Sequence, residues 1–214
     1  MDWRTVDGGG NTSTGGLFQA RSVIGQPDAG KMSGGNFSVA GGFFVGSVSA
    51  YTVSGSVELQ AFAGTNRMVR FVASEVSGVM TNYLQTNDVT LSFSGATAGY
   101  NIQVPPNTTR ISAKTAWHLR RRQAVTLNSG PVTVNFTGAA NLRGGDLVTV
   151  LGGTIDNTDN AVTSTDYLLL LGNYLQTVNG DAAIGRADIN GDGAITSSDY
   201  LLLLGNYLTG GDPQ

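Results

Sequence analysis

The sequence predicts a mainly β protein with a small helical segment near its C-terminal end. Its 31 glycines and its 13% of charged residues favour strands and tight turns over a helical bundle. Apolar and polar residues alternate through most of residues 51–139, as in strands with one buried face. After residue 153 the apolar spacing becomes helical, and the string DYLLLLGNYL occurs twice. We therefore expect a β region followed by two similar helices.

Residues 1–50 form the first expected region, a glycine-rich β module. Glycine pairs alternate there with short apolar runs, which is typical of short strands joined by tight turns. The stretch resembles a glycine-rich module of large bacterial secreted proteins through Trp3, residues 25–30 (GQPDAG) and residues 41–43 (GGF). This resemblance implies no activity.

Residues 51–143 are expected to form an antiparallel β-sandwich, because about seven alternating runs are separated by turns. The runs span residues 51–62, 67–76, 83–95, 99–105, 109–117, 123–128 and 131–138. The order SGSVELQ, GYNIQVPPN, ISAKTAWHLRRR and VTVNFTG resembles the prealbumin-like or carboxypeptidase-regulatory-like sandwich of secreted bacterial proteins. Residues 144–153 are expected to be a linker, in which DLVTVL could add a strand.

Acidic residues are concentrated near the C-terminal end. Residues 151–214 contain eight Asp, no Glu and a single basic residue, Arg186, for a net charge of −7, whereas residues 1–150 carry +4. Such a concentration of Asp in a short segment indicates cation ligation before it indicates solubility. The chain has no cysteine, which excludes disulfides, thiolate zinc sites and cysteine nucleophiles.

The second copy of the repeat contains D-x-N-x-D-G-x5-D, the ligand spacing of a calcium loop. Side chains at positions 1, 3, 5 and 12 converge on one ion, glycine at position 6 permits a sharp reversal, position 7 offers its carbonyl and position 9 acts through water. The expected ligands are Asp188, Asn190, Asp192, Ala194, Thr196 and Asp199. We expect one Ca²⁺ ion in this loop.

The first copy fits the same pattern less well. Aligning Asp166 with Asp199 places Ile155 at position 1, and the adjacent Asp156 needs a bulge to turn inward. Two charged ligands bind calcium less tightly than three. The candidate ligands are Asp156, Asn157, Asp159, Ala161, Thr163 and Asp166. The pair of loops is therefore expected to bind one Ca²⁺ ion or two.

Two loop-helix units thirty-three residues apart, with Asp at position 12 and apolar helices, resemble a type I dockerin over residues 154–209, and we assign residues 154–214 to this domain. The resemblance implies antiparallel packing of the two units, calcium in each loop and one helix face that docks onto a cohesin domain. Positions 17 and 18, often a basic pair in that family, are Leu and Gly in both copies. The partner-binding residues implied by the resemblance are Ser164, Thr165, Leu168, Leu171, Ser197, Ser198, Leu201 and Leu204.

Leu and Tyr occupy almost the whole circumference of each expected helix. A two-helix module has only one mutual face per helix in which to bury them, so an apolar patch is left that needs a cover. The cover is either a cohesin-like partner or the chain's own β-sandwich. Because the two copies are nearly identical, a partner could bind in either of two orientations.

These patterns favour a non-catalytic anchoring module of a secreted, polysaccharide-processing protein, extracellular or at the cell surface, with its signal peptide outside this chain. The alternative is a carbohydrate-binding or adhesive β module in which the calcium pair is only an intramolecular folding clamp. A sugar-stacking platform would use Trp3, Trp117, Tyr51 and Tyr100, although burial in a sandwich is the more common fate of such aromatics.

Enzymatic, nucleic-acid and membrane functions are not expected. No serine elbow motif occurs, Glu58 and Glu75 are the only glutamates, and His118 is the only histidine. The arginines at 120–122 are typical of a solvated strand end rather than of a phosphate-binding patch. No apolar run is long enough to predict membrane insertion.

Overall fold

The protein is described by a computed structural model that divides into two compact units, Met1–Val48 and Ser49–Gln214. In the first unit the structure describes only the backbone of four strands, and in the second it describes residues 50–128 and 130–213. The first unit contains two antiparallel hairpins, formed by β1 (Asn11–Gly15) with β2 (Phe18–Ser22) and by β3 (Lys31–Gly34) with β4 (Phe37–Ala40). Trp3, residues 25–30 and residues 41–43, which carry the resemblance of this segment, lie outside the described residues.

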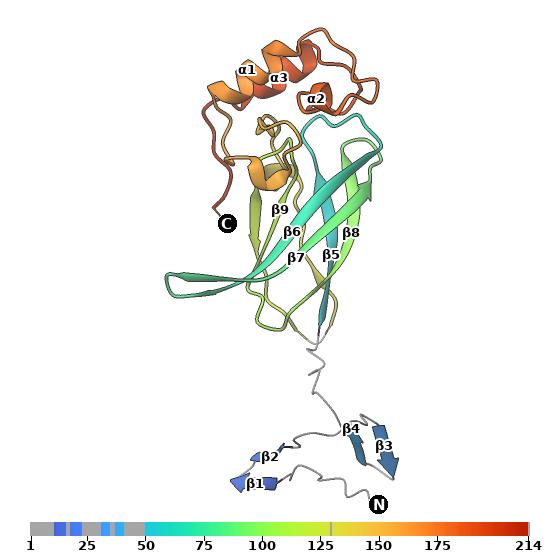
Figure 1. Ribbon diagram of the computed structural model, residues 1–214, viewed down its shortest axis with the longest axis vertical. Coiled ribbons are helices and arrows are strands. Elements are labelled where there is room, and N and C mark those ends of the chain that lie inside the picture. The colour runs from blue at the N-terminus through green and yellow to red at the C-terminus, as the bar shows by residue number, and fades with distance from the viewer. Residues whose placement is uncertain are drawn as a thin grey trace, which may run out of the picture. The chain divides into compact units, whose positions relative to one another are not determined.

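The second unit contains two β-sheets and a helical segment (Figure 1). One sheet has the order β10-β9-β6-β7 and the other the order β11-β5-β8. Their strands are β5 (Tyr51–Glu58), β6 (Asn66–Ser77), β7 (Met80–Ser92), β8 (Thr97–Val104), β9 (Arg110–Lys114), β10 (Arg121–Ala124) and β11 (Val132–Thr133). The predicted fold class, mainly β with a small helical domain, is confirmed.

The first hydrophobic core is built from apolar residues of both sheets. Exposed and buried residues alternate strictly along β8, which is the period-two pattern that predicted the strand. Phe71 of β6 stacks on Tyr100 of β8 with ring centroids 4.4 Å apart, and both rings lie 6.3 Å from Phe136. The Tyr100 hydroxyl donates to the Val134 carbonyl at 2.7 Å. Tyr100 is therefore part of this core and not of a sugar-binding surface.

The β6–β7 hairpin extends well beyond the sheet that it belongs to (Figure 1). A register shift between Ala73 and Ser74 interrupts the pairing, as a β-bulge does. Gly78 turns the chain with a φ of 61°, and the adjacent Val79 side chain is fully exposed. This hairpin tip offers exposed apolar residues that are remote from the helical segment.

The helical segment follows two 3₁₀ turns, η1 (Gly138–Ala140) and η2 (Ile155–Asn157). Its helices are α1 (Ser164–Gly172), α2 (Ala182–Gly185) and α3 (Ser197–Gly205). Thr163 caps α1 and Thr196 caps α3, each in a capping box with the Asp three residues later. No helix among the described residues is long and apolar enough to span a membrane.

A second hydrophobic core lies under the helices. Only one leucine of each four-leucine run, Leu170 in α1 and Leu203 in α3, is fully buried there. The core residues are Leu119, Leu147, Val162, Leu170, Ala187, Ile189, Ile195 and Leu203. Leu119 precedes β10, so this core joins the β region to the helical segment.

The segment expected to be a linker is buried in its first half only. Residues 144–148 are all buried, and they form no strand, so the strand suggested by DLVTVL is not formed. Leu147 instead belongs to the core under the helices. The domain boundaries at residues 50, 143 and 153 stay predictions.

Candidate metal centre and exposed helix faces

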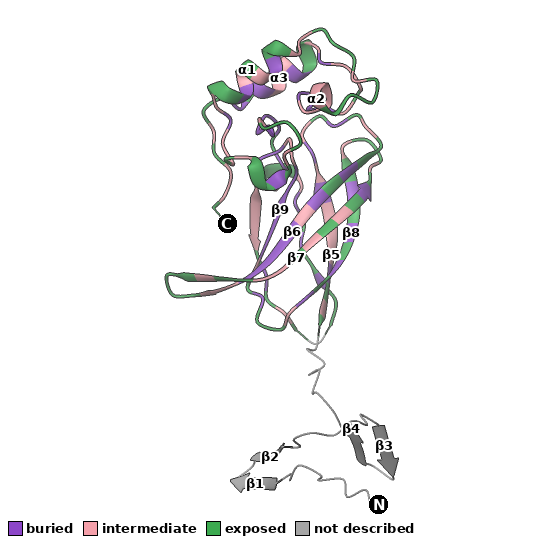
Figure 2. Cartoon of the chain, in the orientation of Figure 1, coloured by how far each residue is buried: buried purple, intermediate pink, exposed green. Residues whose placement is uncertain are grey.

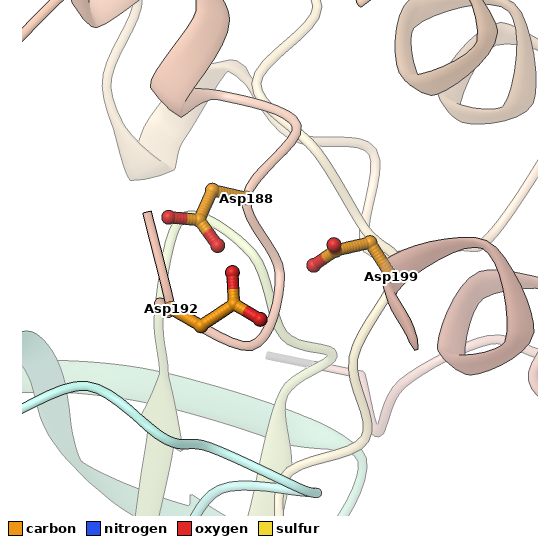
Figure 3. Close-up of side chains that lie close together, drawn as sticks. All are labelled: Asp188, Asp192 and Asp199. Atoms are coloured by element: carbon orange, nitrogen blue, oxygen red, sulfur yellow. The ribbon is translucent and has the colours of Figure 1, made fainter. Parts of the chain in front are cut away.

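The second loop, residues 188–199, gathers three carboxylates around one point (Figure 3). Asp188 follows α2 and Asp199 lies in the first turn of α3, while Asp192 lies between them. Each of the three offers an oxygen that lies within 4.8 Å of the other two. Three acidic oxygens this close repel one another unless a cation lies among them.

The loop backbone is folded onto these carboxylates. The Asp188 carboxylate accepts from the amides of Gly191 at 2.8 Å and Gly193 at 3.0 Å. Both glycines have positive φ, 73° and 90°, a region that side chains with a Cβ rarely occupy. Asp192 accepts from the Ala194 amide at 3.0 Å. The glycine at position 6, expected to permit a sharp reversal, is used in that way.

Asp199 ties the two ends of the second loop together. One of its oxygens accepts from the amides of Ile189 at 2.9 Å and Asn190 at 3.1 Å, and the other accepts from Thr196 at 3.0 Å. The side-chain amide of Asn190 donates to the Asp192 carboxylate at 2.9 Å. Burial raises the pKa of Asp188 and of Asp199 above the ordinary carboxyl value, while the backbone amides oppose that rise.

Oxygen ligands from carboxylates, an amide and a carbonyl are the set that Ca²⁺ takes in proteins. The second loop has such donors at positions 1, 3, 5, 7 and 12, and its three closely spaced carboxylates, of which Asp188 and Asp199 are buried, fit a bound cation. A calcium ion here would neutralise the carboxylates and so stabilise the loop in its folded form.

The two loops are joined to the helices of the opposite copy by backbone pairing. Ile195, at position 8 of the second loop, exchanges hydrogen bonds with Leu175 and Gln176, which follow α1. Val162, at position 8 of the first loop, pairs in the same way with Leu208 and Thr209, which follow α3. Each loop therefore needs the other copy, which is why the repeat occurs twice.

The first loop does not bring its candidate ligands together in the same way. Asp156 lies on η2 with its side chain 72% exposed, and it forms an ion pair with Arg70 of β6. Asn157 caps the same turn by accepting from the Thr154 amide at 2.8 Å. Among the residues that the structure describes, only the second loop holds three acidic side chains close enough to share an ion.

Residues of the β region support the second loop from outside. The Arg67 guanidinium donates to the carbonyls of Asp188 at 3.3 Å and Ile189 at 3.5 Å, and it lies 3.9 Å from the ring centroid of Trp117. Burial lowers the pKa of Arg67 to about 10, and the charges of Asp188 and Asp199 oppose that shift. Trp117 donates its indole N–H to Gly185 at 2.9 Å, so it too is part of the support and not of a sugar platform.

Asn206 forms a second bridge to the β region. Its side-chain amide donates to Gln60 Oε1 at 2.6 Å and to the Gly144 carbonyl at 2.8 Å. Asn173, its counterpart in the first copy, donates only within its own helix, to Leu169 at 2.8 Å. Sequence reasoning missed Arg67, Trp117 and Asn206, because a support residue has no spacing signature.

Each helix has a row of exposed leucines. Exposed parts of α1 and α3 are green in Figure 2. Leu168 and Leu201 are 64% and 63% exposed, and the next equivalent pair, Leu171 and Leu204, is also exposed. Leu175 and Leu208 extend the two rows beyond the helix ends. We call these six residues the leucine rows. The hydroxyl residues expected to flank them, Ser164, Thr165, Ser197 and Ser198, are all exposed.

His118 is fully buried. Its Nδ1 shares a hydrogen bond of 2.8 Å with the Thr115 hydroxyl. Burial, together with the nearby charges of Arg67 and Lys114, holds its pKa well below the usual range. The imidazole is therefore neutral at physiological pH.

Residues 156–209 match the family described as the dockerin type I domain. This match confirms the dockerin placement predicted from the sequence, and it makes this part of the chain a non-catalytic module whose family typically binds calcium. No protein among the curated ones matches the chain.

Two solved structures are similar to the chain. They are described as a C-terminal and an N-terminal interface mutant of a type II Cohesin-X-Dockerin complex from Acetivibrio cellulolyticus. Each is 19% identical to this chain and covers 75% of it and 97% of the matched chain, with TM-scores of 0.48 and 0.47.

Proposed function

We propose that the C-terminal part of this chain is a calcium-folded docking module that binds a cohesin-like domain through its leucine rows. The observation that carries the proposal is the exposure of equivalent leucines on α1 and α3 in a unit whose other helix faces are covered. Exposed apolar surface of this kind is typical of a protein interaction site. The dockerin match supports a cohesin-like domain as the partner.

The β region does not provide the missing cover. Its contacts with the helical segment pass through the loops, through Asn206 and through Trp117, and they leave the leucine rows exposed. The β-sandwich and a cohesin-like partner would therefore cover different faces of the helices. The sandwich supports the loop side, and the leucine rows are open to a second protein.

Calcium has a structural role in this proposal. Asp188, Asn190, Asp192 and Asp199 with the Ala194 carbonyl are the proposed ligands of one ion, and Thr196 acts through water. Because the folded loop holds the helix start in place, the free energy of calcium binding adds to the free energy of unfolding. A secreted assembly acting on polysaccharide is the setting that the dockerin match favours.

The experiment is a binding measurement between the full chain and immobilised type I and type II cohesin domains, in calcium and in chelator. Binding is expected in the presence of calcium and not in chelator. The double variant Leu168→Ser/Leu201→Ser is expected to weaken cohesin binding by at least about tenfold. The matched control is Val79→Ser/Met80→Ser, which removes two exposed apolar side chains from the β6–β7 tip. Absence of binding to every cohesin, or equal loss in both double variants, would contradict the proposal.

The alternative role, an intramolecular clamp, is favoured by one observation. Arg67 and Asn206 connect the second loop and the end of α3 directly to the β region. Calcium should therefore stabilise the β region as well as the helices. If calcium raises the melting temperature of the whole unit but no cohesin binds, the intramolecular clamp is the better interpretation.

A further inference from the structure

The two loops share a pattern of hydrogen bonds that identifies a hidden counterpart of Asp188. In the second loop Ile189, which follows Asp188, donates its amide to Asp199 at 2.9 Å. In the first loop Leu147 donates its amide to Asp166 at 2.8 Å. Leu147 and Ile189 are both buried in the core under the helices. By structure, the residue before Leu147 occupies position 1, and that residue is Asp146.

The C-terminal half of the loops agrees with this correspondence. Ala161 donates to Asp159 at 3.1 Å as Ala194 does to Asp192, and Thr163 donates to Asp166 at 2.7 Å as Thr196 does to Asp199. Asn160 stands in the slot of Gly193 with a positive φ of 60°. Positions 5, 6, 7, 9 and 12 therefore match.

What differs between the loops is the distance along the chain from position 1 to position 12. Asp188 lies eleven residues before Asp199, whereas Asp146 lies twenty residues before Asp166. The additional residues contain η2, which carries Asp156 to Arg70 on the outside. Spacing alone could not find Asp146, because the calcium-loop pattern assumes a fixed length.

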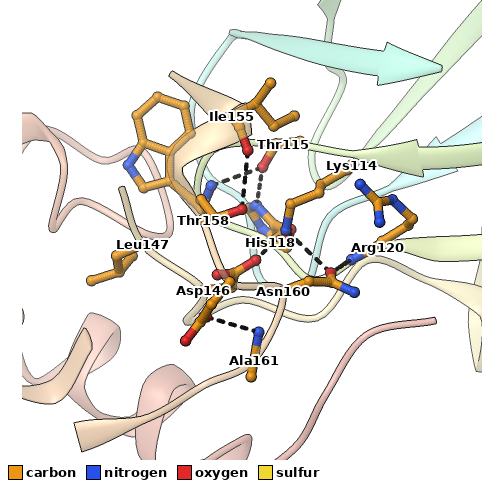
Figure 4. A network of polar contacts seen from close by, with 12 residues as sticks. Lys114, Thr115, His118, Arg120, Asp146, Leu147, Ile155, Thr158, Asn160 and Ala161 are labelled. Carbon is orange, nitrogen blue, oxygen red and sulfur yellow. Dashed lines mark hydrogen bonds and ion pairs between the residues drawn. The ribbon is translucent and has the colours of Figure 1, made fainter. Parts of the chain in front are cut away.

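Asp146 faces a cation that the protein itself supplies (Figure 4). Lys114, at the end of β9, forms a buried ion pair with Asp146, and the two side chains are 4% and 0% exposed. The same ammonium donates to Asn160 Oδ1 at 3.2 Å and to the His118 carbonyl at 3.3 Å. Its neighbours are thus a carboxylate, an amide oxygen and a carbonyl, which are the donor types of a calcium site.

Among the residues that the structure describes, none forms an equivalent ion pair in the second loop. Arg67 approaches it from outside and donates to backbone carbonyls, which leaves the three carboxylates facing one another. In the first loop an ammonium already balances Asp146, and a divalent ion placed beside it would be repelled. The residues of the first loop therefore do not fit a bound calcium.

We propose that Lys114 replaces the calcium ion of the first loop, so that the folded chain binds a single calcium, in the second loop. The calcium part of this inference rests on the proposed function, whereas the internal ion pair stands on its own. Since Lys114 belongs to the β-sandwich, the first loop is held by the sandwich and the second loop is held by calcium. The concentration of calcium then controls the folding of the second loop and not that of the first.

The test is the calcium stoichiometry of the full chain, measured by native mass spectrometry and by calorimetry. The expected result is one ion, with Asp146→Asn retaining that ion at an affinity within about twofold and Asp188→Asn losing it. The Asp146 oxygen that does not face Lys114 accepts no hydrogen bond among the described residues, so it is where a second ion would bind. Two ions in the unmodified chain, or loss of an ion in Asp146→Asn, would overturn the proposal.

Failure of the proposed function gives a different result. A chain that binds no calcium at all contradicts the second loop as a metal centre. The ion pair is then judged by the melting temperatures of Lys114→Met, Asp146→Leu and the double variant in chelator. Recovery of stability in the double variant supports the internal cation, and additive losses reject it.

Discussion

The two loop-helix units have nearly the same helix sequence and share several backbone hydrogen bonds, yet their acidic side chains are arranged differently. The second loop brings three carboxylates together from one short stretch of chain, and no residue that the structure describes forms an ion pair with any of them. The first loop spreads its acids and directs one of them to Lys114. Under the proposals made above, the repeat keeps its backbone pattern while one loop uses a bound ion and the other uses a side chain of the β region.

The largest expected effect comes from Lys114→Met, which leaves the Asp146 carboxylate buried without its partner. Loss of one member of a buried ion pair costs about 3–5 kcal/mol. The free energy of unfolding, measured by urea titration in saturating calcium, should fall by about that amount. A loss below about 1 kcal/mol would show that the ammonium is not needed in the first loop.

The next effect compares position 5 of the two loops. Asp192→Asn should weaken calcium binding by at least about tenfold, since it removes one of three charged ligands. Asp159→Asn is the matched control, because Asp159 accepts the same backbone amide in the first loop. Calorimetry should find the affinity of Asp159→Asn unchanged. Equal losses would mean that both loops bind calcium.

A smaller effect compares two arginines of β6. Arg67→Met removes a buried guanidinium that holds the carbonyls of the second loop, and a cost of about 1.5–3 kcal/mol is expected for hydrogen bonds of a charged group. Arg70→Met removes a more exposed contact with Asp88 and Asp156, which should cost about 1 kcal/mol or less. Only Arg67→Met should also weaken calcium binding. If the two variants lose the same stability and the same calcium affinity, Arg67 does not support the second loop.

The most gradual effect is a dependence of stability on pH in chelator. Burial raises the pKa of Asp146 to about 6 although Lys114 lowers it, so the folded state keeps a proton that the unfolded state releases above the ordinary value of 3.8. The free energy of unfolding should therefore fall as the pH rises from about 4 to about 6, by less than about 1.4 kcal/mol per pH unit.

Other buried carboxyls shift in the same direction, so the control is a difference between variants. Asp146→Asn should show a shallower fall with pH than the unmodified chain, measured by urea unfolding between pH 4 and pH 6.5. Addition of calcium should remove the part that comes from Asp188 and Asp199, because the ion binds their ionised forms. Parallel curves for the two proteins would show that Asp146 does not titrate in this range.

The sequence was sufficient for the elements with a regular period. Alternation predicted β8, and the helical spacing of the repeated four-leucine runs predicted α1 and α3. The grouping of Asp188, Asp192 and Asp199 in space follows from their fixed spacing in one short loop. Local patterns of this kind depend on residues that are close in the chain.

The parts that could not be predicted depend on distant residues. Lys114 lies thirty-two residues before Asp146, and Arg67 lies more than a hundred residues before the loop that it contacts. The buried state of residues 144–148 also has no local signature, since glycine pairs are typical of exposed linkers. The Asp-Leu pair at 146–147, which resembles Asp188 with Ile189, was the one available signal.

The pairing of Val162 with Thr209 has a consequence for the order of events during synthesis. The first loop emerges from the ribosome well before the segment that it pairs with, and residues of 208–212 also bond to Asn160 and Arg120. Domains generally fold as they emerge, beginning with the N-terminal one. The sandwich can therefore fold while the first loop is still unpaired, and the helical pair closes in a late step after residues 208–212 have been made.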